Sequence, residues 1–526
     1  MFNIRQRRQQ IAARLAEQGA QTIRAIATAT GIPKSSVHRH QQGLKQGHQY
    51  PEAALWQTDV GEEWLKRLVV ATIYVFGLTR GVGAESLSEC FYKLGLEHFI
   101  GVSVSSLRHL QTVLEEKVLG YQQVQQERLS QACQSLPALC VGVDETWFES
   151  TILVMMALSS GYLLVEETAA NHRYETWQQV VEPVVKQWGS RIQYCVSDRA
   201  KALIKLALND LGCASIADLF HAMRKLSQGL GFDLERRLTH LRRRLQEQPP
   251  QGAQAVERDP VLQAEYAALQ TAQSQFSEHL AAISLGLHPF DIRTLGAVTT
   301  EQVAVKLSQQ VDALKQFQQQ YQLKDAPGGV DKFKRQIEVL TPIVDLWWQW
   351  VEHSLAAHEL AQPLLSWLTV GLLPLCYWQY QSQRTDKPTL KAQYRDAYQR
   401  AHNVLKAHPL TRTLEAEVYR YWYSWASEMV TKFQRTTAAV EGRNGYLGQI
   451  HHSRRRLSDR QLQVMSVIHN FDLKRLDGST AAQRLFKQPH PDLFQTVLAQ
   501  MHDLPLPRQR AKAAKAQILD AANVPA

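Results

Sequence analysis

The chain has 526 residues, 44% of them hydrophobic and 21% charged, and its 59 Lys and Arg against 49 Asp and Glu give a net charge of +10. At about 150 residues per domain this length predicts three or four domains, and the composition excludes wholesale disorder, a collagen-like repeat and a small disulfide scaffold. The six cysteines include no C-x-x-C pair, so a reducing cytosol is expected rather than a zinc site or a disulfide framework.

The basic charge is concentrated at the N-terminus, where residues 1–48 hold eight Lys or Arg and one acid. Residues 21–46 predict a helix, a tight turn at Gly31 and a second helix with Pro33 in its first turn. The second helix would turn Val37 and Leu44 inward. Its polar side chains would then face outward, namely Lys34, Ser35, Ser36, His38, Arg39 and His40.

This pattern resembles the helix-turn-helix of bacterial DNA-binding proteins, in which the second helix enters the major groove. We therefore expect residues 1–50 to bind DNA through Lys34, Ser35, Ser36, His38 and Arg39. An ordinary helical hairpin with a solvated basic face is the alternative. Residues 51–135 predict further helices that support DNA binding or dimerisation.

The pattern changes to short apolar runs after residue 135. They predict a three-stranded meander, a helix, a fourth strand, a helix, and a fifth short strand that enters another helix. This order is that of an RNase H-like α/β fold. Asp144 ends the first strand and Asp198 the fourth, and these strands are neighbours in that fold. Two such carboxylates would bind two Mg²⁺ or Mn²⁺ ions that activate a water or a 3′-hydroxyl.

Four segments in this order resemble the acidic motifs of DDE transposases of bacterial insertion sequences: VGVDETWF, VSDRAKAL, ADLFHAMRKL and TTAAVEGRNGYLGQIHH. The Asp218-x-x-His221 spacing is similar to a signature of hAT-type and Mutator-like transposases. In those enzymes a large helical insertion precedes the catalytic glutamate. Here residues 232–430 predict helices almost without a break, and Glu441 follows them.

The resemblance implies that Asp144, Asp198 and Glu441 are catalytic and bind the metal ions. Asp218 and His221 would orient the site or contact DNA. The alternative for His221 is a capped histidine in the protein core. The Glu441 helix would also present several supporting and DNA-binding side chains, namely Asn444 beside the site and Arg443, Arg454, Arg455 and Arg456 toward the DNA backbone. A solvated charge run is the alternative for the arginines.

The resemblance also implies a division of the chain. Residues 136–231 and 431–480 would form the RNase H-like core, residues 232–430 an all-α insertion, and residues 481–526 a basic tail.

The predicted insertion contains two notable apolar segments, a cluster of tryptophans and a long uncharged stretch. Trp347, Trp348 and Trp350 cannot all face one side of a helix, so one of them could stack on an unpaired base, with core packing as the alternative. The apolar stretch Leu364–Trp378 has fifteen residues and contains Pro374, whereas a membrane-spanning helix needs about 20. It therefore predicts a buried helix in a protein with no membrane partner.

Together these patterns predict a cut-and-paste DNA transposase in the bacterial cytoplasm, associated with the nucleoid. Its partners would be the double-stranded DNA of the element's ends and of the target, and it would act as a homodimer or a higher homo-oligomer because two ends must be paired. Two alternatives remain open: a domesticated, non-catalytic DNA-binding regulator, and an RNase H-like nuclease without strand transfer.

Overall fold

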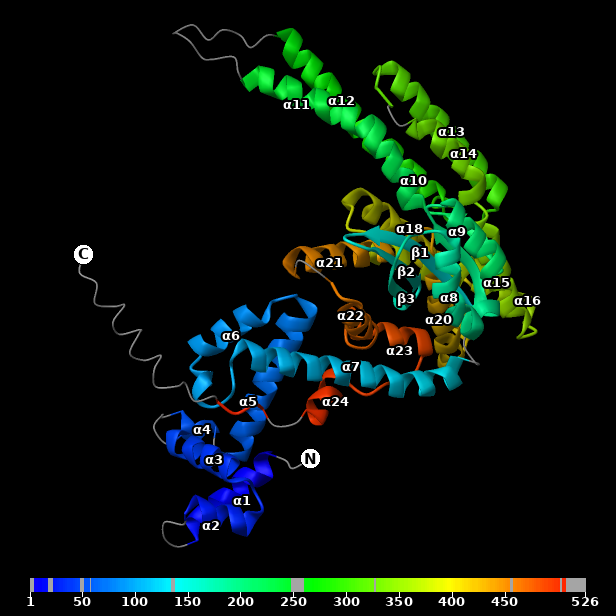
Figure 1. Ribbon diagram of the computed structural model, residues 1–526. Helices are drawn as coiled ribbons and strands as arrows, with labels where there is room; N and C mark the ends of the chain where they lie inside the picture. Colours follow the sequence, from blue (N-terminus) through cyan, green and yellow to red (C-terminus); the bar gives the residue numbers. More distant parts are fainter. Residues whose placement is uncertain are drawn as a thin grey trace. The chain divides into compact units, whose positions relative to one another are not determined.

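The computed structural model describes residues 4–17, 22–47, 52–56, 58–133, 138–246, 260–325, 328–454, 457–501 and 504–507. The chain divides into two compact units, which we call the terminal unit (Met1–Gln134 with Gly445–Ala526) and the sheet unit (Ser135–Asn444). The fold is mixed α/β, as predicted: the described residues are mainly helical, and a five-stranded mixed sheet lies in the sheet unit (Figure 1). The division ends the sheet unit at Asn444, whereas the sequence predicted core structure to residue 480.

The sheet has the strand order β3-β2-β1-β4-β5. Its bounds are Leu139–Trp147 for β1, Thr151–Ala157 for β2, Tyr162–Ala169 for β3, Ile192–Ser197 for β4 and Ala214–Ala217 for β5. β1, β2 and β3 form an antiparallel meander, while β4 runs parallel to β1, and β5 parallel to β4. The predicted meander and the predicted neighbourhood of the first and fourth strands are both confirmed.

The central strands are buried, which explains their nearly continuous apolar sequence. Every residue of β2 is buried, as are the first six residues of β1. Gly142 in β1 allows an unusually close approach, because a Cβ at this position would lie 2.6 Å from Leu158 Cδ2 and 3.2 Å from Val440 Cγ2. Val440 lies on helix α21 (Ala438–Arg454), so this glycine lets α21 pack directly onto the sheet.

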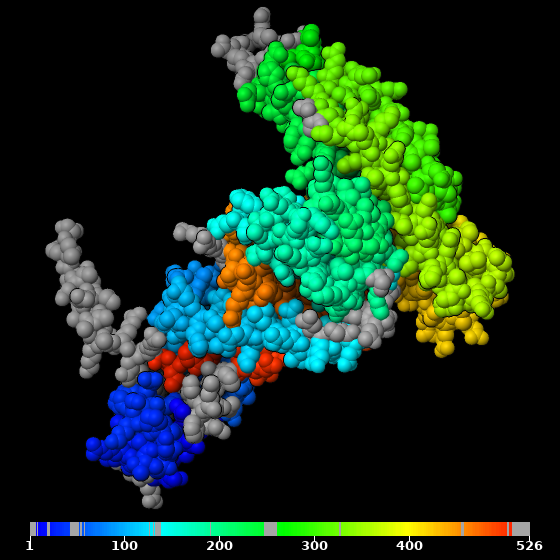
Figure 2. Space-filling view, turned by 45° about the vertical axis from the view of Figure 1, so that its right-hand side comes forward, coloured from blue at the N-terminus to red at the C-terminus, as the bar shows by residue number. Residues whose placement is uncertain are grey.

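Helices make up the rest of the sheet unit. Their bounds are α8 Tyr174–Trp188, α9 Lys201–Lys205, α10 Leu219–Leu226, α11 Phe232–Gln246, α12 Pro260–Gly286, α13 Thr300–Gln320, α14 Gly329–Leu340, α15 Ile343–Ala356, α16 Gln362–Ser366, α17 Leu373–Arg384, α18 Pro388–Ala407, α19 Leu410–Thr413 and α20 Ala416–Thr431. Helices α11 to α14 form an arm that extends away from the sheet and the helices around it (Figures 1 and 2).

The apolar stretch Leu364–Trp378 is helical and mostly buried, as predicted, although Val370 is exposed. It forms the end of α16, a π-helical turn (Trp367–Leu372) and the start of α17, with Trp367 and Trp378 fully buried. Within the described part of the chain, no helix is both long and apolar enough to cross a membrane.

The terminal unit is helical throughout its described residues. Its helices are α1 Ile4–Ala16, α2 Ile23–Thr30, α3 Lys34–Gly47, α4 Ala53–Trp56, α5 Asp59–Thr72, α6 Ala84–Lys93, α7 Val104–Cys133, α22 Asp459–Phe471, α23 Ala481–Phe486 and α24 Leu493–Gln500. Helix α21 begins in the sheet unit and ends in this one.

The first three helices enclose a small core of their own. Ile11, Ile26, Ile32 and Val37 are buried together, and Gly31 ends α2 in the left-handed conformation at φ +66°, as the predicted tight turn requires. On α3, the side chains expected to face outward are exposed or half-buried with one exception. His40 is buried, at 6% exposure, because it follows Val37 by three residues and shares its inward face.

Candidate metal centre

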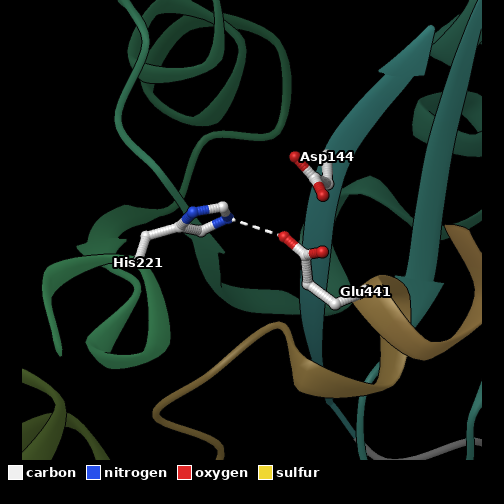
Figure 3. Close-up of side chains that lie close together, drawn as sticks. All are labelled: Asp144, His221 and Glu441. Carbon is white, nitrogen blue, oxygen red and sulfur yellow. Dashed lines mark ion pairs between the residues drawn. The ribbon is translucent and has the colours of Figure 1, made fainter. Parts of the chain in front are cut away.

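Three side chains from distant parts of the sequence converge beside the sheet. Asp144 lies on β1, His221 on α10 and Glu441 in the first turn of α21, and their side chains point toward one another (Figure 3). One ligand atom of each lies within 4.8 Å of the others. The sequence predicted Asp144 and Glu441 at one site but treated His221 as a supporting residue.

The contact between His221 and Glu441 is an ion pair (Figure 3) rather than a well-aligned hydrogen bond. Nε2 of His221 lies 3.1 Å from Oε1 of Glu441, yet this buried nitrogen has no hydrogen-bond partner among the described residues. Two adjacent ligands of an octahedral ion at about 2.1 Å are separated by roughly 3.0 Å. The observed separation is that of an ion pair, and it also matches the spacing of two neighbouring ligands of one ion.

Two of the supporting residues predicted from the sequence contact these side chains. Asn444, one turn after Glu441, donates a hydrogen bond from Nδ2 to Oδ2 of Asp144 at 2.9 Å. Asp218 caps α10 by accepting from the backbone N–H of Phe220 at 2.7 Å, and its carboxylate also accepts from the hydroxyl of Thr437 just before α21. Asp218 therefore joins the helix that carries His221 to the segment that leads into Glu441.

Arg443 does not face solvent, in contrast to the predicted DNA contact. Its guanidinium forms two hydrogen bonds with Glu166 on β3, Nε to Oε1 at 2.7 Å and Nη2 to Oε2 at 2.5 Å. Both side chains are almost completely buried, at 2% and 0% exposure. The residue anchors α21 to the sheet, because the turn that directs Glu441 to the site directs Arg443 to β3.

Asp198 lies near the cluster but is not among its three converging residues. It follows β4 directly and is exposed, and its Oδ1 accepts from the backbone N–H of Ala200 at 2.8 Å. Its charge still helps to raise the pKa of Asp144 and of Glu145. Glu145, for which the sequence analysis assigned no role, is half-buried and keeps one buried carboxylate oxygen without a hydrogen-bond partner in the described structure.

The electrostatics of the cluster favour a bound cation. Burial and the negative charges of Glu441 and Glu145 raise the pKa of Asp144 to about 8. Burial also raises the pKa of Asp218, against the lowering effects of Thr437 and His221. A divalent cation would offset this accumulated negative charge, since an opposite charge within a few ångströms stabilises the ionised carboxylate.

The donor set fits a divalent metal. Two carboxylates and an imidazole nitrogen meet in a space where the buried Nε2 of His221 and Oδ1 of Asn444 lack hydrogen-bond partners among the described residues. Carboxylates suit Mg²⁺ and Mn²⁺, whereas imidazole suits the later transition metals. Asp144, Glu441 and His221 would hold the ion, and the imidazole favours Mn²⁺ over Mg²⁺.

The tryptophans of α15 pack inside the sheet unit. Trp347 is fully buried and donates from Nε1 to the backbone oxygen of Met429 at 3.0 Å. Trp348 is half-buried and donates to the backbone oxygen of Pro289, and the half-buried ring of Trp350 lies under the ammonium of Lys432 at 4.8 Å. Core packing therefore accounts for Trp347, whereas Trp348 and Trp350 are held by contacts at the edge of the core.

Two aromatic side chains close in sequence to the cluster residues are more exposed, and nothing in the sequence singled them out. Trp147, at the end of β1, is 73% exposed, and Phe220, the neighbour of His221, is 39% exposed. Only their exposure distinguishes them from core aromatics, and it has no local sequence signal.

The remaining predicted DNA contacts lie in the terminal unit. Lys34, Ser35, His38 and Arg39 on α3 are exposed, and Ser36 is half-buried. Arg454 is the last residue of α21. Arg455 and Arg456 lie outside the described residues.

Comparison with known proteins adds little chemistry to this geometry. Residues 368–513 match a family of unknown function (DUF6399), a segment that includes Glu441, Arg443 and Asn444 but none of the sheet. A search of curated proteins finds no match.

Proposed function

We propose that the chain is a DNA transposase of the DDE type, which cleaves the ends of its element by metal-dependent phosphodiester hydrolysis and joins the 3′-hydroxyls to target DNA. The observation that carries the proposal is the convergence of Asp144 and Glu441. These residues are 297 positions apart, with the helical segment that includes the arm between them.

The topology supports the proposal. In the RNase H-like fold that the sequence resembles, the first and fourth strands are neighbours in a mixed sheet and carry the first two acids. In this chain β1 and β4 are neighbours, with Asp144 on β1 and Asp198 directly after β4. The α2–Gly31–α3 segment would be the helix-turn-helix that binds the element's ends, with the exposed face of α3 in the major groove.

Each residue of the site would have a defined task. Mg²⁺ or Mn²⁺ ions, when bound, would activate the attacking oxygen and stabilise the leaving oxygen of the phosphodiester. Asn444 fixes the orientation of the Asp144 carboxylate through its hydrogen bond. Asp218 and Thr437 hold α10 and the start of α21 together, which keeps His221 next to Glu441. In this arrangement Asp198 would reach the site from the end of β4 once DNA and ions are present.

The test is a cleavage assay with labelled duplexes of the DNA that flanks the gene on both sides. Wild-type protein with Mn²⁺ or Mg²⁺ should release cut ends and then form strand-transfer products, whereas Asp144→Asn and Glu441→Gln should lose at least 100-fold in rate. The matched control is Glu182→Gln, since Glu182 is an exposed glutamate on α8 whose partner is Lys186. It should cleave like the wild type.

The other outcomes separate the alternative functions. DNA binding without any metal-dependent cleavage would indicate a regulator, and cut ends without joined products would indicate a nuclease. Cleavage by Glu441→Gln at the wild-type rate would refute the proposed site.

A further inference from the structure

The arm of the sheet unit carries a basic face that the site described above does not use. Helix α11 contains five arginines and two acids, Asp233 and Glu235. Asp233 is paired with Arg236 and Arg237 near the start of the helix, and Glu235 accepts from the amide of Gln273. After Glu235 no acid occurs in α11, so the charged side chains in the second half of the helix are all basic.

The orientation of α11 leaves this charge exposed. Its apolar side chains Leu234, Leu238 and Leu241 recur at helical spacing and are buried. Consequently Arg242, Arg243 and Arg244 are exposed. None of the three has a carboxylate partner in the part of the chain that the structure describes; Arg242 contacts the hydroxyl of Tyr266 at 3.5 Å.

The other side of the arm behaves differently. On α13 and α14 two exposed lysines are paired with acids, Lys315 with Asp331 at 3.1 Å and Lys334 with Asp312 at 2.6 Å. A helix C-terminus favours cations in its last turn, which accounts for basic residues at this end of α11. It does not account for three neighbouring arginines that have no carboxylate partner among the described residues, and such a cluster attracts an anion such as a phosphate.

The basic face is joined to the metal centre by continuous helix. Helix α10, a π-helical turn (Ser227–Gly231) and α11 follow one another without a non-helical residue. From His221 to Arg243 is 22 residues, or about 33 Å at 1.5 Å per residue. Arg224, one turn beyond His221, is exposed at the near end of this rod. One turn of B-DNA spans a similar length, about 34–36 Å.

We propose that Arg242, Arg243 and Arg244 bind the phosphate backbone of duplex DNA about one helical turn, or about 10 bp, from the scissile phosphate. A duplex that runs along the α10–α11 rod presents its backbone to the same side once per turn, so it meets the protein at the metal centre and again at the basic end of α11. The position relative to the scissile phosphate rests on the proposed function, whereas the contact with duplex DNA does not.

The contact is tested by binding of a labelled 40-bp duplex of arbitrary sequence, since phosphate contacts carry no sequence information. The full chain with Glu441→Gln is used in EDTA, so that the DNA stays intact. Each lost phosphate contact lowers the salt slope by about 0.9, which corresponds to about 8-fold in affinity at 0.1 M relative to 1 M salt. Arg243→Gln with Arg244→Gln should therefore weaken binding by about 10- to 60-fold and reduce the slope by about 1.8.

The matched control is Lys315→Gln with Lys334→Gln, which removes the same charge from the arm at residues paired with acids. It should bind within about twofold of the parent. Equal effects of the two double variants would overturn the proposal, as would weakened binding of single-stranded DNA alone. Unchanged melting temperatures would show that both variants are folded.

The register is tested separately on a duplex that the wild type cleaves. Neutral methylphosphonates placed 8–12 bp from the cut should weaken binding of the parent but not of Arg243→Gln with Arg244→Gln; an equal effect on both would refute the one-turn register. Failure of the proposed function has a different signature: the wild type would bind the duplex with the full salt slope but would not cleave it in Mn²⁺ or Mg²⁺.

Discussion

The pair formed by Arg443 and Glu166 allows the sharpest test of how α21 is held. Arg443→Met keeps most of the side-chain volume and removes the charge. It leaves the Glu166 carboxylate, whose side chain is 0% exposed, without the guanidinium that donates two hydrogen bonds to it. A buried carboxylate without its charge partner is costly because the protein interior cannot replace its hydration.

The size of the effect follows from the burial of both partners. Removing one member of a buried ion pair costs about 3–5 kcal/mol. The sheet unit spans 310 residues, Ser135 to Asn444, and for a unit of this size 1 kcal/mol corresponds to about 2 °C in melting temperature. Arg443→Met should therefore lower the melting temperature of the sheet unit by about 6–10 °C. Adding Glu166→Leu should restore most of the loss, since the buried carboxylate that lost the guanidinium is then absent.

Tryptophan fluorescence is a suitable readout because ten of the twelve tryptophans belong to the sheet unit. The control is Lys186→Met, which breaks an exposed pair with Glu182, with side chains 74% and 61% exposed. It should melt at the wild-type temperature. The reasoning is refuted if Arg443→Met melts within 2 °C of the wild type, or if the double variant melts as low as Arg443→Met alone.

Three further predictions concern titration and metal choice. Affinity for Mn²⁺ in the absence of DNA should rise about tenfold per pH unit up to about pH 8 and then level off, because the Asp144 carboxyl with its raised pKa must lose a proton to bind; calorimetry that finds no pH dependence would contradict this. His221→Asn should lower the ratio of Mn²⁺ to Mg²⁺ affinity several-fold in the same titrations, since it removes the nitrogen ligand, and an unchanged ratio would exclude His221 as a ligand. Burial holds the pKa of His288 well below its usual value between the hydroxyls of Tyr377 and Tyr394. Below about pH 6.5 the histidine therefore binds a proton in the unfolded chain but not in the folded one, and the free energy of unfolding should fall by up to 1.4 kcal/mol per pH unit. In chemical denaturation His288→Asn should show a shallower pH dependence than the wild type, and an identical dependence would contradict the assignment.

Local patterns in the sequence were sufficient to predict the elements of the sheet and the strands near which its acids lie, but not every strand end. Short apolar runs locate the strands, and Asp198 directly follows β4 as expected. Asp144, in contrast, does not end the first strand: β1 continues through polar residues to Trp147, because these residues still pair with β2. The helix that carries Glu441 was predicted from local sequence in the same way. These features depend on residues within a few positions of one another, which a single sequence records directly.

The partners of individual side chains could not be predicted, because they depend on contacts between distant segments. Arg443 is 277 residues from Glu166, and nothing near Arg443 distinguishes it from a basic residue that faces DNA. The same limit applies to Trp347, whose indole partner Met429 is 82 residues away. It applies equally to His221, whose proximity to Glu441 becomes visible only once α10 and α21 are both placed against the sheet.

These long-range contacts are also what gives the site its precision. Successive residues of a helix are 100° apart, so Glu441 and Asn444 share the side of α21 that faces Asp144, while Arg443 points to β3. Val440 packs over Gly142, because a Cβ at Gly142 would lie 3.2 Å from the Cγ2 methyl group of Val440. Helix α21 is therefore held against β1 and against β3 at once, which fixes both its rotation and its height above the sheet. The separation of Glu441 from Asp144 is thus set by the sheet rather than by flexible side chains. A metal centre requires this, because its ligand distances must be held to a few tenths of an ångström.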